Sequence, residues 1–185
     1  EIRSLHVEDA RNAPGVHLLL TAADLVAGGV KLGMKGERIE ALGGKGAGPE
    51  RPVLARTHVR FVGEAIAMVV ADTPEAARDA IEMISFDIKD IEPALHLKVE
   101  EPTIHPEAAK NHAFDFVFGD EAGTDAALRE ATYRVAVEVI HNRVTAAPME
   151  PRAAYAEWAG ARLHLCVNGQ GVWVQRNELS RMLGI

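Results

Sequence analysis

The sequence predicts an α+β fold, and three stretches carry that prediction. Residues 59–91 contain a continuous apolar run, then a helical stripe and then a short alternating run, which together predict strand, crossover helix and strand. Residues 133–144 form the longest alternating run in the chain, which indicates a half-buried strand. Residues 172–183 carry apolar side chains at helical spacing. Because strand-like runs occur in both halves and helices are only occasional, the pattern favours α+β.

The composition is that of a soluble globular protein with an excess of acidic groups. The 185 residues are 48% hydrophobic and 25% charged, which is enough apolar side chain for one sizeable core. The net charge of -7 argues against nucleic acid or an anionic membrane surface as the main partner. No apolar run approaches the roughly 20 residues of a membrane-spanning helix. The single cysteine, Cys166, excludes an internal disulfide framework and a cysteine-rich metal site, and it suits the cytoplasm.

The N-terminal quarter predicts two strands, each followed by a short helical segment. Pro14-Gly15 breaks the first helical segment, and the hydroxyl of Thr21 can cap the second. The predicted elements are a strand at 2–7, one or two helical turns at 8–13, a buried strand at 16–20 and a helical turn at 22–25.

Residues 28–48 hold half of the chain's glycines, and Gly43-Gly44-Lys45-Gly46-Ala47-Gly48 superficially resembles a phosphate cradle. No strand leads into this stretch, no Ser or Thr follows the lysine, and no helix begins there to direct N–H groups at an anion. We therefore interpret it as an excursion between strands. Two further strands are predicted beyond it, at 51–54 and 58–62.

The strand–helix–strand unit is expected to seed the core. Its first strand, 65–71, is continuously apolar, which predicts burial on both faces. Thr73 then offers an N-cap, and Pro74 fits the first helical position. An alternating strand follows at 84–88, after a helical stripe of Ala77, Ala80, Ile81 and Ile84. Because Ile81 lies on that stripe, Ile81→Asp is predicted to cost several kcal/mol.

The C-terminal half begins with a linker candidate at 99–113, which has two prolines, several charges and no period. The predicted elements that follow are a strand at 114–118, a helix at 125–131 capped by Thr124, the strand at 133–144, strands at 153–158 and 163–167, a loop at 168–171 and the helix at 172–183.

Most chemistry-bearing residues have a plain structural interpretation. None of the eight histidines has the spacing of a helical metal-ligand pair, and no GxSxG motif surrounds a serine. Asp87, Asp90 and Glu92 leave a predicted strand and are expected to be a solvated rim. Cys166 alternates with apolar strand residues and has no base close in sequence, so we interpret it as a strand cysteine.

Two turns are less easily assigned. Glu150 and Arg152 flank Pro151 after the long strand, so the prolines around them restrict the direction of the backbone. The alternative is a surface turn with an incidental ion pair worth at most ~1 kcal/mol. Gln170 lies between two glycines, which allow close backbone approach to a ligand, and its amide both donates and accepts hydrogen bonds. The alternative is a simple strand-to-helix turn.

Together these stretches resemble the large, molybdenum-binding subunit of the xanthine dehydrogenase, aldehyde oxidase and aerobic carbon monoxide dehydrogenase family. The likeness spans nearly the whole chain. Residues 12–16 and 21–25 resemble that family's PGV…TxADL segment, and residues 59–95 resemble its α/β-hammerhead domain. The opening of its molybdenum-cofactor domain is similar to Gly119-Asp120, to RVTAAPMEPRAAYAEW at 143–158, to Gln170 and to Leu183-Gly184.

The resemblance implies an α/β-hammerhead domain at 1–98, a linker at 99–118 and a truncated start of the molybdenum-cofactor-binding domain at 119–185. It implies that Gln170 lies beside a molybdenum oxo ligand, to which its NH₂ group can donate without adding charge. Glu150 and Arg152 match the family's MEPR step and are expected to position their neighbours. No catalytic residue is assigned, and no side chain is expected to ligate the metal, which the pterin dithiolene holds.

The implied cofactor is molybdopterin with molybdenum, in its cytosine dinucleotide form, and the implied reaction oxidises a small molecule with oxygen from water. The implied partners are the rest of the large subunit, an FAD-binding medium subunit and a 2Fe–2S small subunit. The family's GGGFGG segment and catalytic glutamate have no counterpart here, so we expect a fragment that is inactive alone and is able to self-associate. The residues that choose the substrate are expected to lie mostly beyond Ile185. The competing hypothesis is a stand-alone hammerhead domain that binds a protein or small ligand without catalysis.

Overall fold

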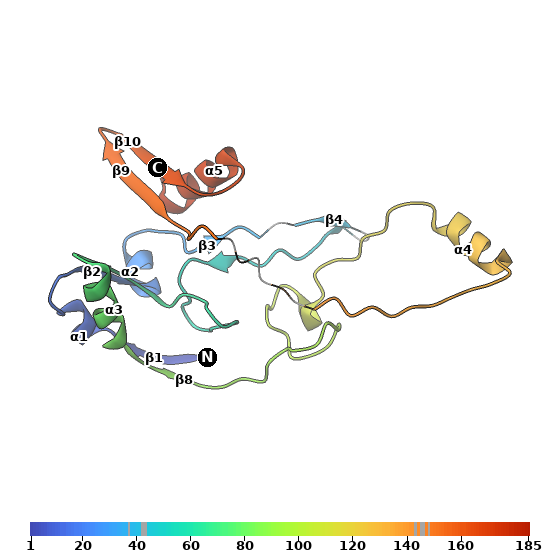
Figure 1. The fold of residues 1–185 in the computed structure, drawn as a ribbon, viewed down its shortest axis with the longest axis horizontal. Helices are drawn as coiled ribbons and strands as arrows, with labels where there is room; N and C mark the ends of the chain where they lie inside the picture. The colour runs from blue at the N-terminus through green and yellow to red at the C-terminus, as the bar shows by residue number, and fades with distance from the viewer. Residues whose placement is uncertain (37, 42–43, 143, 145–146, 148) are drawn as a thin grey trace. The chain divides into compact units, whose positions relative to one another are not determined.

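A computed structural model describes residues 1–36, 38–41, 44–142, 144, 147 and 149–185 (Figure 1). The chain divides into two compact units. The first unit combines Glu1–Phe116 with Val174–Ile185, and the second is Val117–Trp173. Over the described residues the strands form two-stranded antiparallel sheets, and helices are interspersed among them, as the α+β prediction requires. No helix in this part of the chain is long and apolar enough to cross a membrane.

The core of the first unit lies beside two strand pairs. β1 (Ile2–His6) pairs with β8 (Ser85–Ile88), and β2 (Val16–Thr21) pairs with β7 (Ala67–Ala71). The buried cluster consists of Val7, Ala10 and Leu19, with Leu5, Ala67, Val69 and Ile84 packed against it. The helices α1 (Glu8–Arg11) and α3 (Pro74–Glu82) pack against each other and against the β2–β7 pair, at the left of Figure 1.

The predicted strand–helix–strand succession is present as β7, α3 and β8, but its two strands do not pair with each other. Each pairs instead with an N-terminal strand, because β2 and β1 supply complementary antiparallel edges. The prediction that residues 65–71 are buried on both faces is wrong. In β7 the residues alternate between half-buried and exposed, and Met68 and Val70 are 47% and 42% exposed.

The start of α3 is confirmed, whereas its predicted buried face is only partly right. The Thr73 hydroxyl accepts a hydrogen bond from the Ala76 N–H at 3.2 Å, and Pro74 is the first helical residue. Ala80 is completely buried, but Ile81 is 54% exposed. The two residues are about 100° apart around the helix, so only one of them faces the core squarely.

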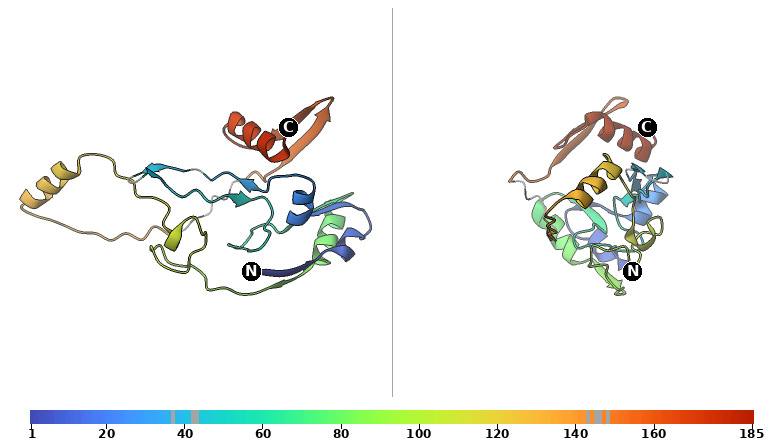
Figure 2. Two further views of the ribbon diagram at one scale, coloured as in Figure 1. Left: turned by 180° about the vertical axis from the view of Figure 1, so that it is seen from behind. Right: turned by 90° about the vertical axis from the view of Figure 1, so that its right-hand side faces the viewer.

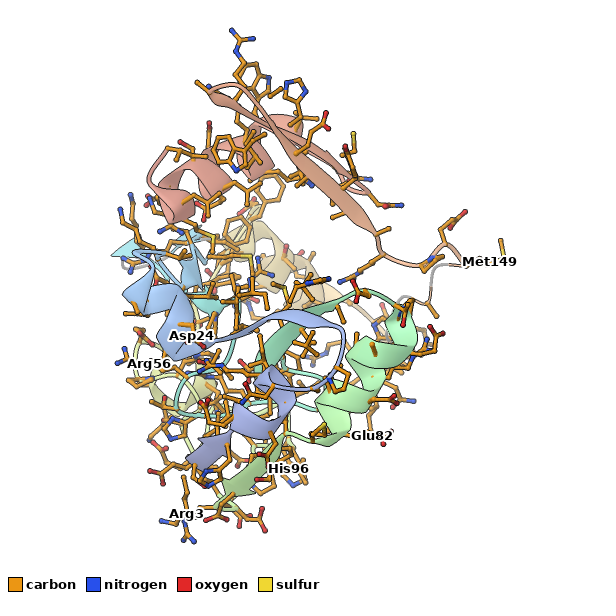
Figure 3. The ribbon with its side chains drawn as sticks, turned by 90° about the vertical axis from the view of Figure 1, so that its left-hand side faces the viewer. Arg3, Asp24, Arg56, Glu82, His96 and Met149 are labelled. Atoms are coloured by element: carbon orange, nitrogen blue, oxygen red, sulfur yellow. The ribbon has the colours of Figure 1, made fainter. Side chains whose placement is uncertain are left out.

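The second helix, α2 (Ala22–Ala27), begins with a capping box. The Thr21 hydroxyl accepts from the Asp24 N–H, and the Asp24 carboxylate accepts from the Thr21 N–H at 2.8 Å and from its hydroxyl at 2.6 Å. Arg11 Nη2 adds an ion pair with Asp24 Oδ2 at 2.6 Å. Figure 3 labels Asp24 on this helix. The helix predicted at 22–25 is therefore confirmed and extends to Ala27.

Replacing Asp24 by asparagine is expected to cost about 1 kcal/mol at pH 7, since the ion pair is a third exposed. Hydrogen bonds from the Thr21 hydroxyl and N–H, and then the Arg11 guanidinium, hold the Asp24 pKa below its usual 3.8. A lowered carboxyl pKa gives stability that is complete above the unfolded-state pKa and is lost as pH falls through the folded-state pKa. Melting curves should therefore show a constant gap between the two proteins from pH 7 to about pH 5, and the gap should close below pH 4. A gap that widens in acid would contradict this assignment.

The glycine-rich excursion contains very short strand pairs. β3 (Gly33–Met34) pairs with β6 (Arg51–Pro52), and β4 (Glu40–Ala41) pairs with β5 (Gly44–Lys45). The strand predicted at 51–54 is thus reduced to its first two residues. The strand predicted at 58–62 is wrong, because this stretch is irregular. In place of a strand, the Glu64 carboxylate accepts from the Arg60 N–H at 2.5 Å, and the side chain of Glu64 is only 6% exposed.

The second unit consists of a helix, an extended stretch and a hairpin. α4 (Glu121–Glu130) starts earlier than predicted, because Asp120 caps it by accepting from the Gly123 N–H at 2.9 Å, so Thr124 lies inside the helix. The strands predicted at 114–118 and 133–144 are absent from the described residues. A short 3-10 helix, η1 (Ala109–Asn111), lies in the predicted linker.

The hairpin and the last helix are confirmed. β9 (Ala154–Ala159) and β10 (Arg162–Val167) form an antiparallel pair, which the two views of Figure 2 show as adjacent orange-red arrows. α5 (Val172–Leu183) has the predicted bounds. Of its predicted apolar side, Met182 is 6% exposed while Val172 is 77% exposed. The packed end of the helix is therefore its C-terminal end.

Candidate functional site

The candidate site is built at one end of the β9–β10 hairpin. Ala159 pairs with Arg162 at the turn, where Gly160 has a φ of +62° that favours glycine. At the opposite end Ala154 pairs with Val167. Chain entering β9 and chain leaving β10 must therefore lie at the same end of the hairpin.

Gln170 lies in the loop that leaves β10, two residues before α5 begins. Its side chain is exposed. Gly171 has a φ of +76°, the left-handed backbone that turns the chain from the strand into the helix. The loop therefore presents an uncharged amide, with a donor and an acceptor, at an open surface.

Glu150 and Arg152 lie in the chain that enters β9, so the hairpin register brings them to the same end as Gln170. Both side chains are exposed. Figure 3 labels Met149, which directly precedes Glu150. Four residues of the motif, Arg143, Thr145, Ala146 and Pro148, lie outside the described residues. Glu150 and Arg152 thus have a place beside the loop, and their role stays a prediction.

One face of the β9–β10 hairpin carries several titratable groups. Directly opposed residues share a face, so Tyr155 lies beside Cys166, and Glu157 lies beside His164. The Tyr155 hydroxyl donates to Glu157 Oε2 at 2.5 Å, which raises the pKa of the tyrosine. Cys166 is a free, exposed thiol. This face is a solvated strand surface, and the described residues of the chain contain no group of three or more His, Cys, Asp or Glu that could hold a metal ion.

The acidic rim residue Asp87 and the histidines of the predicted linker lie in the first unit. The Asp87 carboxylate is 3.7 Å from Arg3 Nη1, and both side chains are more than half exposed, which is typical of a solvated rim. His112 Nε2 is 3.0 Å from Asp115 Oδ1. Burial lowers the pKa of His105, and the positive charge of Arg60 adds to that effect.

A hollow of about 370 Å³ lies beside the glycine-rich segment that we interpreted as an excursion between strands. It is lined by Gly44, Lys45, Gly46, Ala47, Glu107, Ala109, His112, Ala113, Phe114 and Asp115. Acidic and basic groups both face it, so its charge favours no one ligand class. Among the described residues of this glycine segment no helix begins, which agrees with the rejection of a phosphate cradle. The expectation that no strand leads into the segment is wrong, because the short strand β4 precedes it.

Sequence reasoning missed two residues that hold α5 in place, Glu178 and Arg181. They form an ion pair with 2.7 Å between Arg181 Nη2 and Glu178 Oε2. The available signal was their i, i+3 spacing near the end of a predicted helix, where an acid and a base are neighbours on one face. That spacing alone does not distinguish a surface pair from an anchoring pair.

Comparison with known proteins gives two family matches in series. Residues 1–92 match the "Aldehyde oxidase and xanthine dehydrogenase, a/b hammerhead domain" family, and residues 104–185 match the "Molybdopterin cofactor-binding domain" family. The order of the two families is the order that the resemblance implied.

Relatives and solved structures agree with these matches. The nicotine 6-hydroxylase large subunit of Paenarthrobacter nicotinovorans is 32% identical over 100% of this chain and 22% of its own length. The carbon monoxide dehydrogenase large chain of Hydrogenophaga pseudoflava is 29% identical over 100% of this chain and 24% of its own. The quinoline 2-oxidoreductase structure from Pseudomonas putida 86 has a TM-score of 0.73 and 27% identity, covering 100% of this chain and 23% of that one.

The chain thus spans less than a quarter of the length of these relatives, and it aligns with them over its whole extent. Both family matches, the named relatives and the structural likeness agree on one assignment. The chain belongs to the family of molybdenum hydroxylase large subunits that includes xanthine dehydrogenase and carbon monoxide dehydrogenase, with a hammerhead domain followed by the start of a molybdopterin cofactor-binding domain.

Proposed function

We propose that this chain is part of the large subunit of a molybdopterin-dependent oxidoreductase, and that Gln170 contributes one wall of its cofactor pocket. The observation that carries the proposal is the exposed amide of Gln170 on a glycine-flanked turn within the residues that match the cofactor-binding family. The complete enzyme would oxidise a small molecule with oxygen taken from water. The relatives name carbon monoxide dehydrogenase and nicotine 6-hydroxylase, so the substrate class extends from carbon monoxide to N-heterocycles.

The residues present fit a molybdopterin cofactor. The exposed, uncharged amide of Gln170 can both donate a hydrogen bond to an oxygen of that group and accept one from it. When bound, the group supplies two-electron oxidation chemistry at molybdenum. Gln170 would donate a hydrogen bond from its NH₂ group to an oxygen of the cofactor, while Glu150 and Arg152 would position the neighbouring chain. The cofactor is proposed in its cytosine dinucleotide form.

We also propose the domain limits 1–98 and 119–185, with a linker at 99–118. We further propose that the chain works in an assembly with three other parts. These are the rest of the large subunit, an FAD-binding subunit and a 2Fe–2S subunit, in the cytoplasm. Exposed apolar side chains support this assembly, because further parts of the large subunit or its partners would cover them. Val172, Trp173 and Val174 are 67–77% exposed, and Tyr133, Val135, Val137 and Val139 are 77–88% exposed. An isolated chain with such surfaces is expected to self-associate and to be inactive.

The proposal is tested by purifying the full-length large subunit with its partners and measuring two quantities. The preparation is expected to contain about one molybdenum and one pterin per large subunit, and to reduce a dye with carbon monoxide, a purine, an aldehyde or an N-heterocycle as donor. The 185-residue chain alone, given the same cofactor, is expected to show no turnover. A full-length preparation without molybdenum, or a turnover by the isolated chain, would overturn the proposal.

A further inference from the structure

The C-terminal half of α5 is fastened to the segment 31–35 by hydrogen bonds that lie within the first compact unit. Arg181 Nη2 donates to the Gly33 carbonyl at 2.5 Å and to Glu178 Oε2 at 2.7 Å. The same Glu178 oxygen accepts from the Lys35 N–H at 3.2 Å. The Met182 carbonyl accepts from the Lys31 N–H at 2.9 Å. We call Glu178, Arg181 and Met182 the α5 latch.

The latch is better packed than an ordinary surface pair. Met182 is 6% exposed, and the side chains of Arg181 and Glu178 are 21% and 27% exposed. Hydrogen bonds from Arg181 and from the Lys35 N–H lower the pKa of Glu178, so the carboxylate stays charged at neutral pH.

The latch belongs to two family domains at once. Segment 31–35 lies in the residues that match the hammerhead family, whereas the latch residues lie in those that match the cofactor-binding family. The helix α5 is continuous from Val172 to Leu183, and Gln170 stands two residues before it. An α-helix is stiff, so fixing its last two turns restrains its first turn and the loop joined to it.

We propose that Arg181 and Glu178 are positioning residues, through which the hammerhead domain holds the start of α5 and with it the turn that carries Gln170. Neither residue needs to touch the cofactor. The effect of these residues on catalysis rests on the proposed function of Gln170. Their mechanical effect, which is to restrain the loop at 168–171, does not depend on that function. Catalysis depends steeply on such placement, since an error of about 1 Å can cost on the order of 100-fold in rate.

The mechanical part is tested by hydrogen exchange on the 185-residue chain. Arg181→Met and Glu178→Gln are expected to speed amide exchange roughly tenfold at Lys31 and Lys35, through the first turn of α5 and at residues 168–171, without changing exchange in the core around Leu19. Arg129→Met, an exposed arginine near the end of α4, serves as the matched control and should change none of these amides. Faster exchange at Lys31 and Lys35 with an unchanged loop would overturn the inference, because the latch would then be merely structural.

The catalytic part is tested in the full-length enzyme. Arg181→Met is expected to lower kcat per bound molybdenum roughly tenfold, with KM and molybdenum content nearly unchanged, whereas Arg129→Met leaves kcat unchanged. If Arg181→Met does not fold, Arg181→Lys replaces it under the same criteria, because lysine keeps the charge but cannot donate to two oxygens in the same fork geometry. An unchanged kcat alongside a loosened loop would remove the link to Gln170. If Gln170→Ala is itself without effect, the proposed function fails while the exchange result still stands.

Discussion

Replacing Gln170 by alanine in the full-length large subunit is expected to lower turnover per bound molybdenum by roughly 10- to 100-fold. On the role proposed for Gln170, the substitution removes one hydrogen-bond donor to an oxygen of the cofactor, and alanine offers no donor in its place. The exposed position of Gln170 in this chain means that the substitution removes no packing contact of the core. Melting temperature and molybdenum content are therefore expected to stay close to those of the unaltered enzyme.

Two further variants sharpen this test. Gln170→Glu keeps the length of the side chain but replaces the NH₂ donor by an oxygen and adds a negative charge, so its loss of turnover should be at least as large. Gln175→Ala, five residues along the chain within α5, removes the same chemical group from the body of the helix and should leave turnover within about twofold. Equal kinetics for the unaltered enzyme and Gln170→Ala would remove Gln170 from the site.

Most helix boundaries were predicted well from the sequence, because their determinants are local. The exception is α4, which begins at Glu121 after an Asp120 cap and not at 125. The capping hydroxyls of Thr21 and Thr73 find their partners three residues along the chain, so nothing distant can change the outcome. The hairpin of β9 and β10 is equally local, since its two strands are joined by a two-residue turn. The bounds of α5 follow from the Gly171 turn before it and Gly184 after it, both of which have positive φ.

Strands whose partners are distant were predicted poorly. An alternating pattern indicates that a stretch can be a strand, but it does not name the chain that will pair with it. The stretch 133–144 keeps its alternation and yet has no strand partner among the described residues, with Val137 77% exposed. In β7, the apolar run that predicted burial on both faces leaves Met68 and Val70 exposed, because a two-stranded pair offers cover on one face only.

The candidate site was predictable only in part. The turn at Gln170 follows from its two glycines, but a simple strand-to-helix turn would have the same residues, so the resemblance to a known family was needed to single out the amide. Arg181 and Glu178 escaped prediction because their partners are backbone groups of Gly33 and Lys35, about 145 residues away in the sequence. Backbone donors and acceptors carry no sequence signature, so no pattern in α5 could have revealed these partners.

The second large effect is expected in the core, where aspartate at two adjacent positions of α3 should destabilise the fold to very different extents. Ala80→Asp places a charge at a completely buried position and is expected to cost about 3–5 kcal/mol in the free energy of unfolding. Ile81→Asp alters a side chain that is 54% exposed, so its carboxylate can stay hydrated and the cost should be about 1 kcal/mol. This corrects the expectation from the helical stripe, which placed Ile81 in the core.

The pair is a matched comparison because most other terms cancel. Both substitutions introduce aspartate near the C-terminal end of α3, so both carry a similar penalty from the helix dipole, and the difference in helix propensity between the replaced residues is below about 1 kcal/mol. Urea unfolding of the 185-residue chain, followed by the circular dichroism of its helices, measures the two midpoints. Since small domains are stable by only about 5–15 kcal/mol, Ala80→Asp should bring the first unit close to unfolding, while Ile81→Asp should not. Equal losses at the two positions would show that the stripe, not the packing of β7 on α3, describes the buried face.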